Sequence, residues 1–168
     1  MKLITLSQGK YAIVDDEDFE IVSKFKWSLA HRKGNDYAYR TVIGANGSRS
    51  IQLMHTFLMG RLGVDHKNGN GLDNRRENLR GCTPSQNAGN MRKSRKSTSS
   101  MFKGVYWSKH KGKWHSSIKV NYIKMHLGYF DNEVQAALAY DKAARIVFGV
   151  FAAINFPTDG ERGALVYG

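Results

Sequence analysis

A nine-residue segment in the second half of the chain contains no apolar residue and divides the sequence into two parts. It runs RKSRKSTSS from Arg92 to Ser100, basic at first and then rich in hydroxyl groups. Such a composition cannot bury itself in a core and is typical of a linker. We therefore expect one part at residues 1–91, a linker at 92–100, a second domain at 101–157 and a tail at 158–168.

The charge of the chain narrows the class of its partner. Lys and Arg number 26 against 14 Asp and Glu, a net charge of +12, and residues 61–100 alone hold nine basic and three acidic side chains. Nucleic acid is the usual partner of such a chain, and an anionic membrane surface is a weaker alternative. No apolar run approaches the ~20 residues of a membrane span, and the start of the chain lacks a signal-peptide core.

The single cysteine, Cys82, excludes whole classes of small protein. It cannot form an internal disulfide, and it rules out zinc sites that need two or more thiolates. We therefore expect no structural zinc. In a short apolar strand Cys82 is best interpreted as a small hydrophobic residue.

The first sixty residues have the pattern of a small β-rich scaffold. Leu3 to Val14 alternates roughly and contains Gly9, which predicts a hairpin. The acids from Asp15 to Asp18 precede a helix start, since they favour the positive end of its dipole. Asn46-Gly47 is the strongest hairpin signal in the chain. Strands are expected at 25–30, 36–42 and 49–54.

A polar loop follows in the middle of the chain. A short apolar strand ends in Asp65-His66, and the next residues are rich in Gly and Asn, as turn-forming loops are. After a short strand at 79–82, Thr83-Pro84 suits a helix N-cap and first position, with Asn87 one turn further on. The expected unit is strand, polar loop, strand and helix.

These residue types suit phosphodiester hydrolysis. The reaction needs a base for water and a metal ion that neutralises the phosphate and the leaving oxygen. His66 is a suitable base near pH 7, and a hard divalent ion would accept oxygens from Asp65 and Asn87. Neighbouring residues of a regular strand point to opposite faces, so Asp65 and His66 need a twisted strand end or a bulge to share a site.

The run from Val64-Asp65-His66 to Asp73-Asn74-Arg75-Arg76-Glu77-Asn78-Leu79, followed by Asn87, resembles the HNH homing endonucleases of phages. The resemblance implies a ββα-metal hairpin and helix, with His66 as general base and Asp65 and Asn87 as ligands of Mg²⁺ or another divalent ion such as Mn²⁺. It implies that Asn78 orients His66 or ties the loop. The zinc-binding cysteine pairs frequent in that family are absent. His55, beside apolar Leu53 and Phe57, is interpreted as packed rather than catalytic.

Residues 101–157 predict a three-stranded antiparallel sheet packed on one helix. Three strand-like runs, at 103–107, 113–120 and 124–130, are separated by turn-like gaps. A helix from Val134 to about Phe148 follows an Asp-Asn-Glu cap and stops at Gly149. The helix would cover one face of the sheet and leave the other face free for a partner. The whole chain is thus expected to be α+β.

Gly104-Val105-Tyr106-Trp107, Leu127-Gly128-Tyr129-Phe130, the run AALAYDKAA at 136–144 and Asn155-Phe156-Pro157 resemble the APETALA2/ethylene-response DNA-binding domain. The resemblance implies that strand side chains contact DNA, and by position the candidates are Tyr106, Trp107, Lys109, Lys113, Ser117, Lys119, Lys124 and His126. Lys reads guanine less well than Arg, so we do not transfer the plant site preference. Core packing is an equal alternative for Trp107.

The linker allows two compatible interpretations. It can be a solvated connection without contacts. It can also be a basic tether that follows the phosphate backbone, with the contacts made by Arg92, Lys93, Arg95 and Lys96.

The leading hypothesis is a homing-type DNA endonuclease that nicks or cuts duplex DNA in the cytoplasm of a phage-infected bacterial cell. A DNA-binding regulator with an inactive nuclease module is the alternative, and RNA binding is weaker still. Double-stranded DNA is the expected partner, with no membrane and no obligatory protein partner, and with a homodimer as an option.

Overall fold

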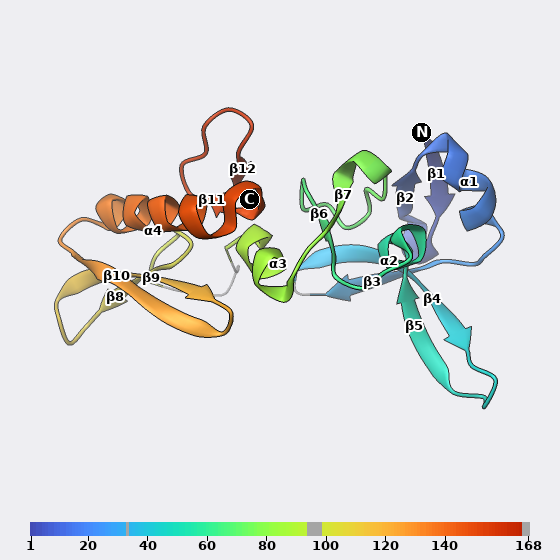
Figure 1. Cartoon of the computed structure of the whole chain (residues 1–168), viewed down its shortest axis with the longest axis horizontal. Helices are drawn as coiled ribbons and strands as arrows, with labels where there is room; N and C mark the ends of the chain where they lie inside the picture. The colour runs from blue at the N-terminus through green and yellow to red at the C-terminus, as the bar shows by residue number, and fades with distance from the viewer. Residues whose placement is uncertain (33, 94–98, 166–168) are drawn as a thin grey trace. The chain divides into compact units, whose positions relative to one another are not determined.

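The computed structural model describes residues 1–32, 34–93 and 99–165 and has a mixed α and β fold with several small sheets (Figure 1). The chain forms two compact units, Met1–Cys82 and Thr83–Gly168. This division differs from the expected linker at 92–100, because the short helix before the linker packs within the second unit. No helix in the described parts of the chain is long and apolar enough to span a membrane.

The first unit begins with the expected hairpin and helix. Strands β1 (Lys2–Thr5) and β2 (Tyr11–Val14) pair antiparallel around a 3-10 turn, η1 (Ser7–Gly9). Helix α1 (Asp16–Ser23) follows, and its first turn holds three acids that favour the positive end of the helix dipole.

A three-stranded antiparallel sheet comes next, in the order β3-β4-β5. Its strands are β3 (Ser28–Arg32), β4 (Asn35–Ile43) and β5 (Arg49–Leu53), close to the predicted ranges. The predicted Asn46-Gly47 turn joins β4 to β5, and Gly47 has φ +76°, which only glycine adopts at low cost. Helix α2 (Met54–Met59) then ends at Gly60.

The motif region folds as a second hairpin on the same core. Strands β6 (Val64–His66) and β7 (Leu79–Gly81) pair antiparallel, and the loop between them ends in a 3-10 turn, η2 (Arg76–Asn78). Val64 and Leu79 lie in one apolar cluster with core residues of β1, β2, α1 and α2. The β-rich N-terminal segment and the motif hairpin therefore form a single packed body.

The second unit begins with α3 (Pro84–Asn90). Thr83 is the N-cap and Pro84 lies in the first turn, as predicted, and Gln86 completes a capping box. Gly89 packs so closely on the ring of Phe148 that an added Cβ would lie 2.6 Å from it. The Lys103 ammonium donates to the carbonyl oxygens of Gly89 and Met91, at 2.6 Å each. These contacts explain why α3 belongs to the second unit.

The predicted sheet and helix make up most of the second unit. Strands β8 (Val105–Ser108), β9 (Lys113–Val120) and β10 (Ile123–Phe130) form an antiparallel sheet in the order β10-β9-β8. Helix α4 (Glu133–Phe148) starts at the N-cap Asn132 and ends at Gly149, as predicted. It packs on the sheet through apolar clusters that include Val105, Ile118 and small alanines.

A buried polar pair fixes the end of the second unit. Both carboxylate oxygens of Asp141 accept backbone N–H groups, one from Asn155 and one from Phe156, at 2.8 Å each. Asn155 in turn exchanges two hydrogen bonds with the backbone of Lys103. The short elements η3 (Gly149–Phe151), β11 (Ala153–Ile154) and β12 (Arg162–Gly163) complete this region. The Asp and Asn of the quoted motifs thus have a structural role.

Candidate functional site

Asp65 and His66 lie side by side on β6, and both are buried. Asp65 stands opposite Arg80 in the strand register, and its Oδ2 accepts from Arg80 Nη2 at 2.9 Å and from Nε at 3.0 Å. His66 stands opposite Leu79, a core residue. The two neighbours therefore contact different groups, as expected from strand alternation.

His66 belongs to a group of three rings that we call the inner cluster: Tyr37, His55 and His66. The ring of His55, at the start of α2, meets the ring of His66 edge to face at 4.8 Å. Tyr37, on β4, lies 5.9 Å from His66 and 5.8 Å from His55. No local sequence pattern points to Tyr37 or connects His55 with His66, since these contacts join distant segments.

Both imidazoles of the inner cluster are buried. His55 is 6 % exposed, and its Nδ1 has no hydrogen-bond partner within the described chain. Burial, with a smaller contribution from the charge of His66, lowers the pKa of His55 to about 3. His55 is therefore neutral at physiological pH. His66 Nε2 lies 3.4 Å from Asn74 Oδ1, a long hydrogen bond.

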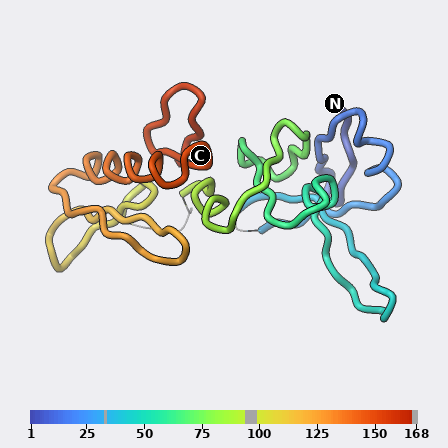
Figure 2. The backbone as a smooth tube through the Cα atoms, viewed as in Figure 1, coloured from blue at the N-terminus to red at the C-terminus, as the bar shows by residue number. Residues whose placement is uncertain are grey.

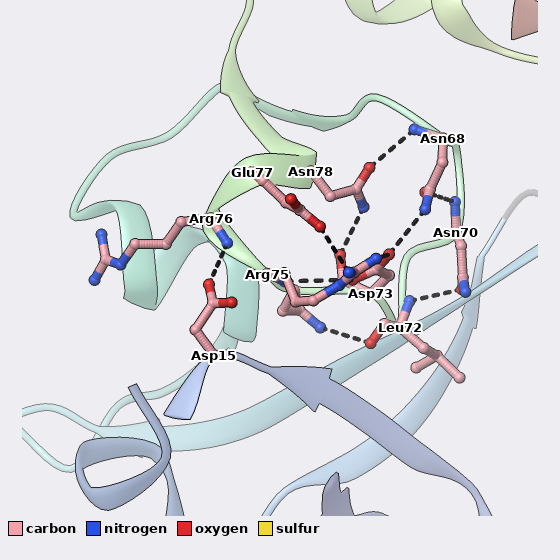
Figure 3. Close-up of polar contacts among 10 residues, drawn as sticks. Asp15, Asn68, Asn70, Leu72, Asp73, Arg75, Arg76, Glu77 and Asn78 are labelled. Carbon is pink, nitrogen blue, oxygen red and sulfur yellow. Dashed lines mark hydrogen bonds and ion pairs between the residues drawn. The ribbon is translucent and has the colours of Figure 1, made fainter. Parts of the chain in front are cut away.

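Asn78 closes the loop that separates the two strands of the motif hairpin (Figure 3). Its side-chain oxygen accepts from the Asn68 backbone N–H at 3.0 Å, and its amide nitrogen donates to the Asp73 carbonyl at 2.7 Å. Asn68 reaches the Asp73 carboxylate at 2.9 Å and also accepts from the backbone of Asn70. These contacts tie the loop, and the role of Asn78 in the site stays a prediction.

The N-terminal hairpin supports the same loop through its backbone. The Ile13 N–H donates to the Leu72 carbonyl, and the Asn74 N–H donates to the Ile13 carbonyl, both at 2.8 Å. On the other side Gly71 touches Asp36 and Tyr37 so closely that no Cβ would fit. Edge pairing with β2 and contact with β4 therefore fix the path of the loop.

Ion pairs and hydrogen bonds between acids and arginines also hold the loop in place. Asp73 and Arg75 form a bidentate pair at 2.8 Å, and hydrogen bonds from Arg75 lower the pKa of Asp73. The Arg76 backbone N–H donates to the Asp15 carboxylate at 2.7 Å (Figure 3). The Arg76 guanidinium donates to both carboxylate oxygens of Asp18. Asp15 and Asp18, with Glu17, are close enough to share a cation. Arg76 already accounts for two of these three acids.

Asn87, the second expected metal ligand, lies on α3 in the second unit. Its side chain is exposed, and its backbone N–H donates to the Thr83 carbonyl at 3.0 Å in the first helical turn. The ligand pair Asp65 and Asn87 stays a prediction, since the two residues belong to different units.

The second unit presents a group of rings on the sheet face opposite α4. We call it the sheet-face cluster: Tyr106, His115, His126 and Tyr129. The rings of His115 and His126 stack at 4.6 Å, and His115 Nε2 lies 2.6 Å from His126 Nδ1. Tyr106 and Tyr129 flank His115 at 4.5 Å and 5.0 Å. Lys124 donates to the Tyr106 hydroxyl at 3.3 Å.

The remaining DNA-contact candidates fall into different surroundings. Ser117 and Lys119 lie on the same sheet face as the sheet-face cluster. Trp107 lies on the α4 side of the sheet, the same side as Val105, and its ring is 5.1 Å from the ring of Trp114. Lys113 pairs with Asp131 at 2.9 Å, and Lys109 is exposed in the β8–β9 turn.

Of the linker candidates, Arg92 is exposed, and partial burial lowers the pKa of Lys93. Arg95 and Lys96 lie outside the described residues.

Sequence comparisons match a known family in the middle of the chain, across the boundary between the two units. A family model described as HNH endonuclease matches residues 61–89. An uncharacterised HNH endonuclease of Acanthamoeba polyphaga mimivirus is 33% identical over 159 residues, which cover 91% of this chain and 79% of the relative.

A second relative matches part of the chain. An AP2-like ethylene-responsive transcription factor of Arabidopsis thaliana is 40% identical over 73 residues, which cover 44% of this chain and 15% of the plant protein. No solved structure matches the chain with significance.

Proposed function

The chain belongs to the HNH endonuclease family, and on that premise we propose that it is a homing-type enzyme that hydrolyses phosphodiester bonds of double-stranded DNA with one divalent metal ion. The observation that carries the proposal is the placement of Asp65 and His66 at the buried end of a hairpin. The loop that follows is fixed by Asn78 and by the edge of β2.

His66 acts as the general base. The contact between its Nε2 and Asn74 Oδ1 orients the ring, and the neutral imidazole takes the proton of the attacking water. His55, with its low pKa, adds no positive charge beside His66. Histidine is the side chain best suited to accept a proton near pH 7.

Asp65 and Asn87 hold the metal ion in this proposal. A buried carboxylate and an exposed amide are hard oxygen donors, which suit Mg²⁺ or Mn²⁺ rather than a thiolate-bound metal. When bound, the ion neutralises the scissile phosphate and the leaving oxygen. Arg80 orients the Asp65 carboxylate through two hydrogen bonds, and Asn78 keeps the loop closed over the hairpin end.

The sheet of the second unit binds the duplex. Lys119, Lys124 and the sheet-face cluster supply cations and ring faces on the side opposite α4. The plant relative, a transcription factor by name, supports a DNA-binding role for this region. One His66 in each chain favours nicking, and a double-strand break would then require two chains or two events. The viral relative supports a viral setting, and we retain the cytoplasm of a phage-infected cell as the proposed location.

Plasmid cleavage tests the proposed activity. We expect the parent chain with Mg²⁺ or Mn²⁺ to convert supercoiled plasmid to the nicked form, and His66→Ala to lower the rate about 10²- to 10⁴-fold. His110→Ala, in the β8–β9 turn, is the matched control and should cut like the parent. Equal cleavage by His66→Ala would remove His66 as the base. A parent chain that binds DNA but leaves every target intact would favour a DNA-binding regulator with an inactive nuclease module.

A further inference from the structure

Strands β4 and β5 extend past the rest of their sheet as a two-stranded ribbon, residues 40–52. β3 pairs only with Asn35–Tyr39 of β4, whereas Arg40–Ile43 pairs with β5 alone. The ribbon projects from the other elements of the first unit and ends in a free tip (Figures 1 and 2). The proposed nuclease chemistry does not use it.

The tip of the ribbon is an ordered turn. The Gly44 N–H donates to the Ser48 carbonyl at 2.8 Å, and the Gly47 N–H donates to the Gly44 carbonyl at 2.9 Å. The Asn46 side chain accepts from the Ser48 N–H at 3.0 Å. These bonds keep the two strands in register up to the end of the ribbon.

The base of the ribbon is attached to the candidate active site. β4 begins beside the inner cluster at Tyr37, and β5 runs directly into α2 and His55. The Arg40 guanidinium stacks on the Phe25 ring at 3.7 Å and donates to Gln52 on the opposite strand at 2.9 Å. The ribbon is therefore a stiff extension of the elements that surround His66.

The surface of the ribbon combines exposed apolar side chains with positive charge. Ile43 is 66% exposed and Ile51 is 54% exposed, and Arg49 is exposed opposite Ile43. The ribbon, residues 40–52, contains two arginines, Arg40 and Arg49, and no acid. Such a surface complements the DNA backbone and can also meet apolar parts of the bases.

We propose that this ribbon enters the major groove of the substrate and contacts the duplex to one side of the cleaved bond. A two-stranded ribbon fits that groove, where Ile43 and Ile51 would meet thymine methyl groups and Arg49 a phosphate or guanine. Ile43 lies six positions after Tyr37 on β4, a length of ~20 Å along a strand. The contact would thus lie ~6 base pairs from the scissile phosphate. The inference rests on the proposed function and adds a contact outside the catalytic residues.

Duplex binding by the full chain tests the charge of the ribbon. With a labelled mixed-sequence duplex of about 40 base pairs, we expect Arg49→Ala to weaken binding about threefold and to reduce the salt slope by about 1. Lys10→Ala, exposed in the turn between β1 and β2, is the matched control and should bind like the parent. An unchanged affinity and salt slope for Arg49→Ala would overturn the ribbon contact while leaving the nuclease proposal intact. A parent chain that binds no duplex would overturn both.

Cross-linking tests the position of the tip. The one native cysteine, Cys82, is buried, so a photoactivated cross-linker attached through Ala45→Cys reports the exposed tip. We expect this variant to cross-link to the duplex, and the matched Lys10→Cys variant to give little product. Cross-links between two protein chains in place of protein–DNA products would assign the ribbon to self-association and overturn the proposal.

Discussion

Two clusters of histidine and tyrosine lie in this chain, one in each unit, and they differ in what surrounds them. The inner cluster is enclosed by the core and the motif loop, with His55 and His66 only 6% and 4% exposed. The sheet-face cluster stacks on an open sheet beside Lys124, and Tyr106 and Tyr129 are 38% and 42% exposed. Both histidines of the inner cluster are thus buried, whereas in the sheet-face cluster His115 is buried and the other three rings are exposed.

The difference shows how the surroundings set the use of an imidazole. In the inner cluster, fixed neighbours hold one orientation of His66, which a base needs. In the sheet-face cluster, burial and the charges of His126 and Lys124 lower the pKa of His115, while His126 stays exposed to solvent. The first arrangement suits chemistry and the second suits contact with a polyanion.

The largest expected effect comes from removing one histidine from each cluster. His66→Ala should lower single-turnover cleavage about 10²- to 10⁴-fold with little change in duplex affinity. His126→Ala should weaken binding a few fold and leave cleavage at saturating protein unchanged, because it acts only through contact. A gel-shift assay and a cleavage time course on the same DNA measure both quantities. If both variants lost cleavage at saturating protein, His126 would act in more than DNA binding, and the assignment of cleavage to the inner cluster and binding to the sheet-face cluster would be wrong.

The loop that supports the inner cluster should be costly to disturb. Asn78→Ala leaves the Asn68 N–H and the Asp73 carbonyl without their partner, and we expect a loss of about 3 kcal/mol in stability of the first unit. Amide hydrogen exchange of β1 and β2 measures this loss. Asn46→Ala, which removes one exposed turn bond, is the matched control and should cost less than about 1 kcal/mol.

Acid should destabilise the inner cluster through His55. Its pKa is about 3 in the folded chain against 6.5 for an unperturbed histidine, so the unfolded chain binds the additional proton between these values. The stabilisation is complete above pH 6.5 and is lost as the pH falls toward 3, by about 2 kcal/mol at pH 5. Exchange of β1 and β2 amides at pH 7.5 and pH 5 measures it, with His55→Gln as the comparison. An equal pH dependence in His55→Gln would assign the effect to other groups.

The smallest expected effects concern the lysines beside the sheet-face cluster. Lys119→Ala and Lys124→Ala should each weaken duplex binding about threefold and reduce the salt slope by about 1, because each removes one phosphate contact. Lys142→Ala, on α4 away from the open face, is the matched control. A salt slope unchanged in all three variants would remove this face from the DNA interface.

Local patterns in the sequence predicted the elements well and their long-range contacts poorly. The Asn46-Gly47 turn, the Thr83 N-cap and the limits of α4 follow from residue types within a few positions, and the structure confirms them. Alternation along β8 also places Trp107 beside Val105, on the helix side.

The surroundings of His66 could not be predicted in the same way. Tyr37, His55 and the edge of β2 reach the motif from distant segments, and their contacts arise from packing that no local pattern encodes. The catalytic candidates were thus visible as a motif, while the groups that hold them were not.

The pairing of the motif loop with the N-terminus also sets the order of folding. Asp15 and Arg76 are 61 positions apart, and Ile13 pairs with residues on either side of Asp73. Contacts of such high sequence separation form late, after local hairpins and helices. A translation product that ends before Leu72 would lack the residues that pair with Ile13, and one that starts after Ile13 would lack the other side of the same pairing.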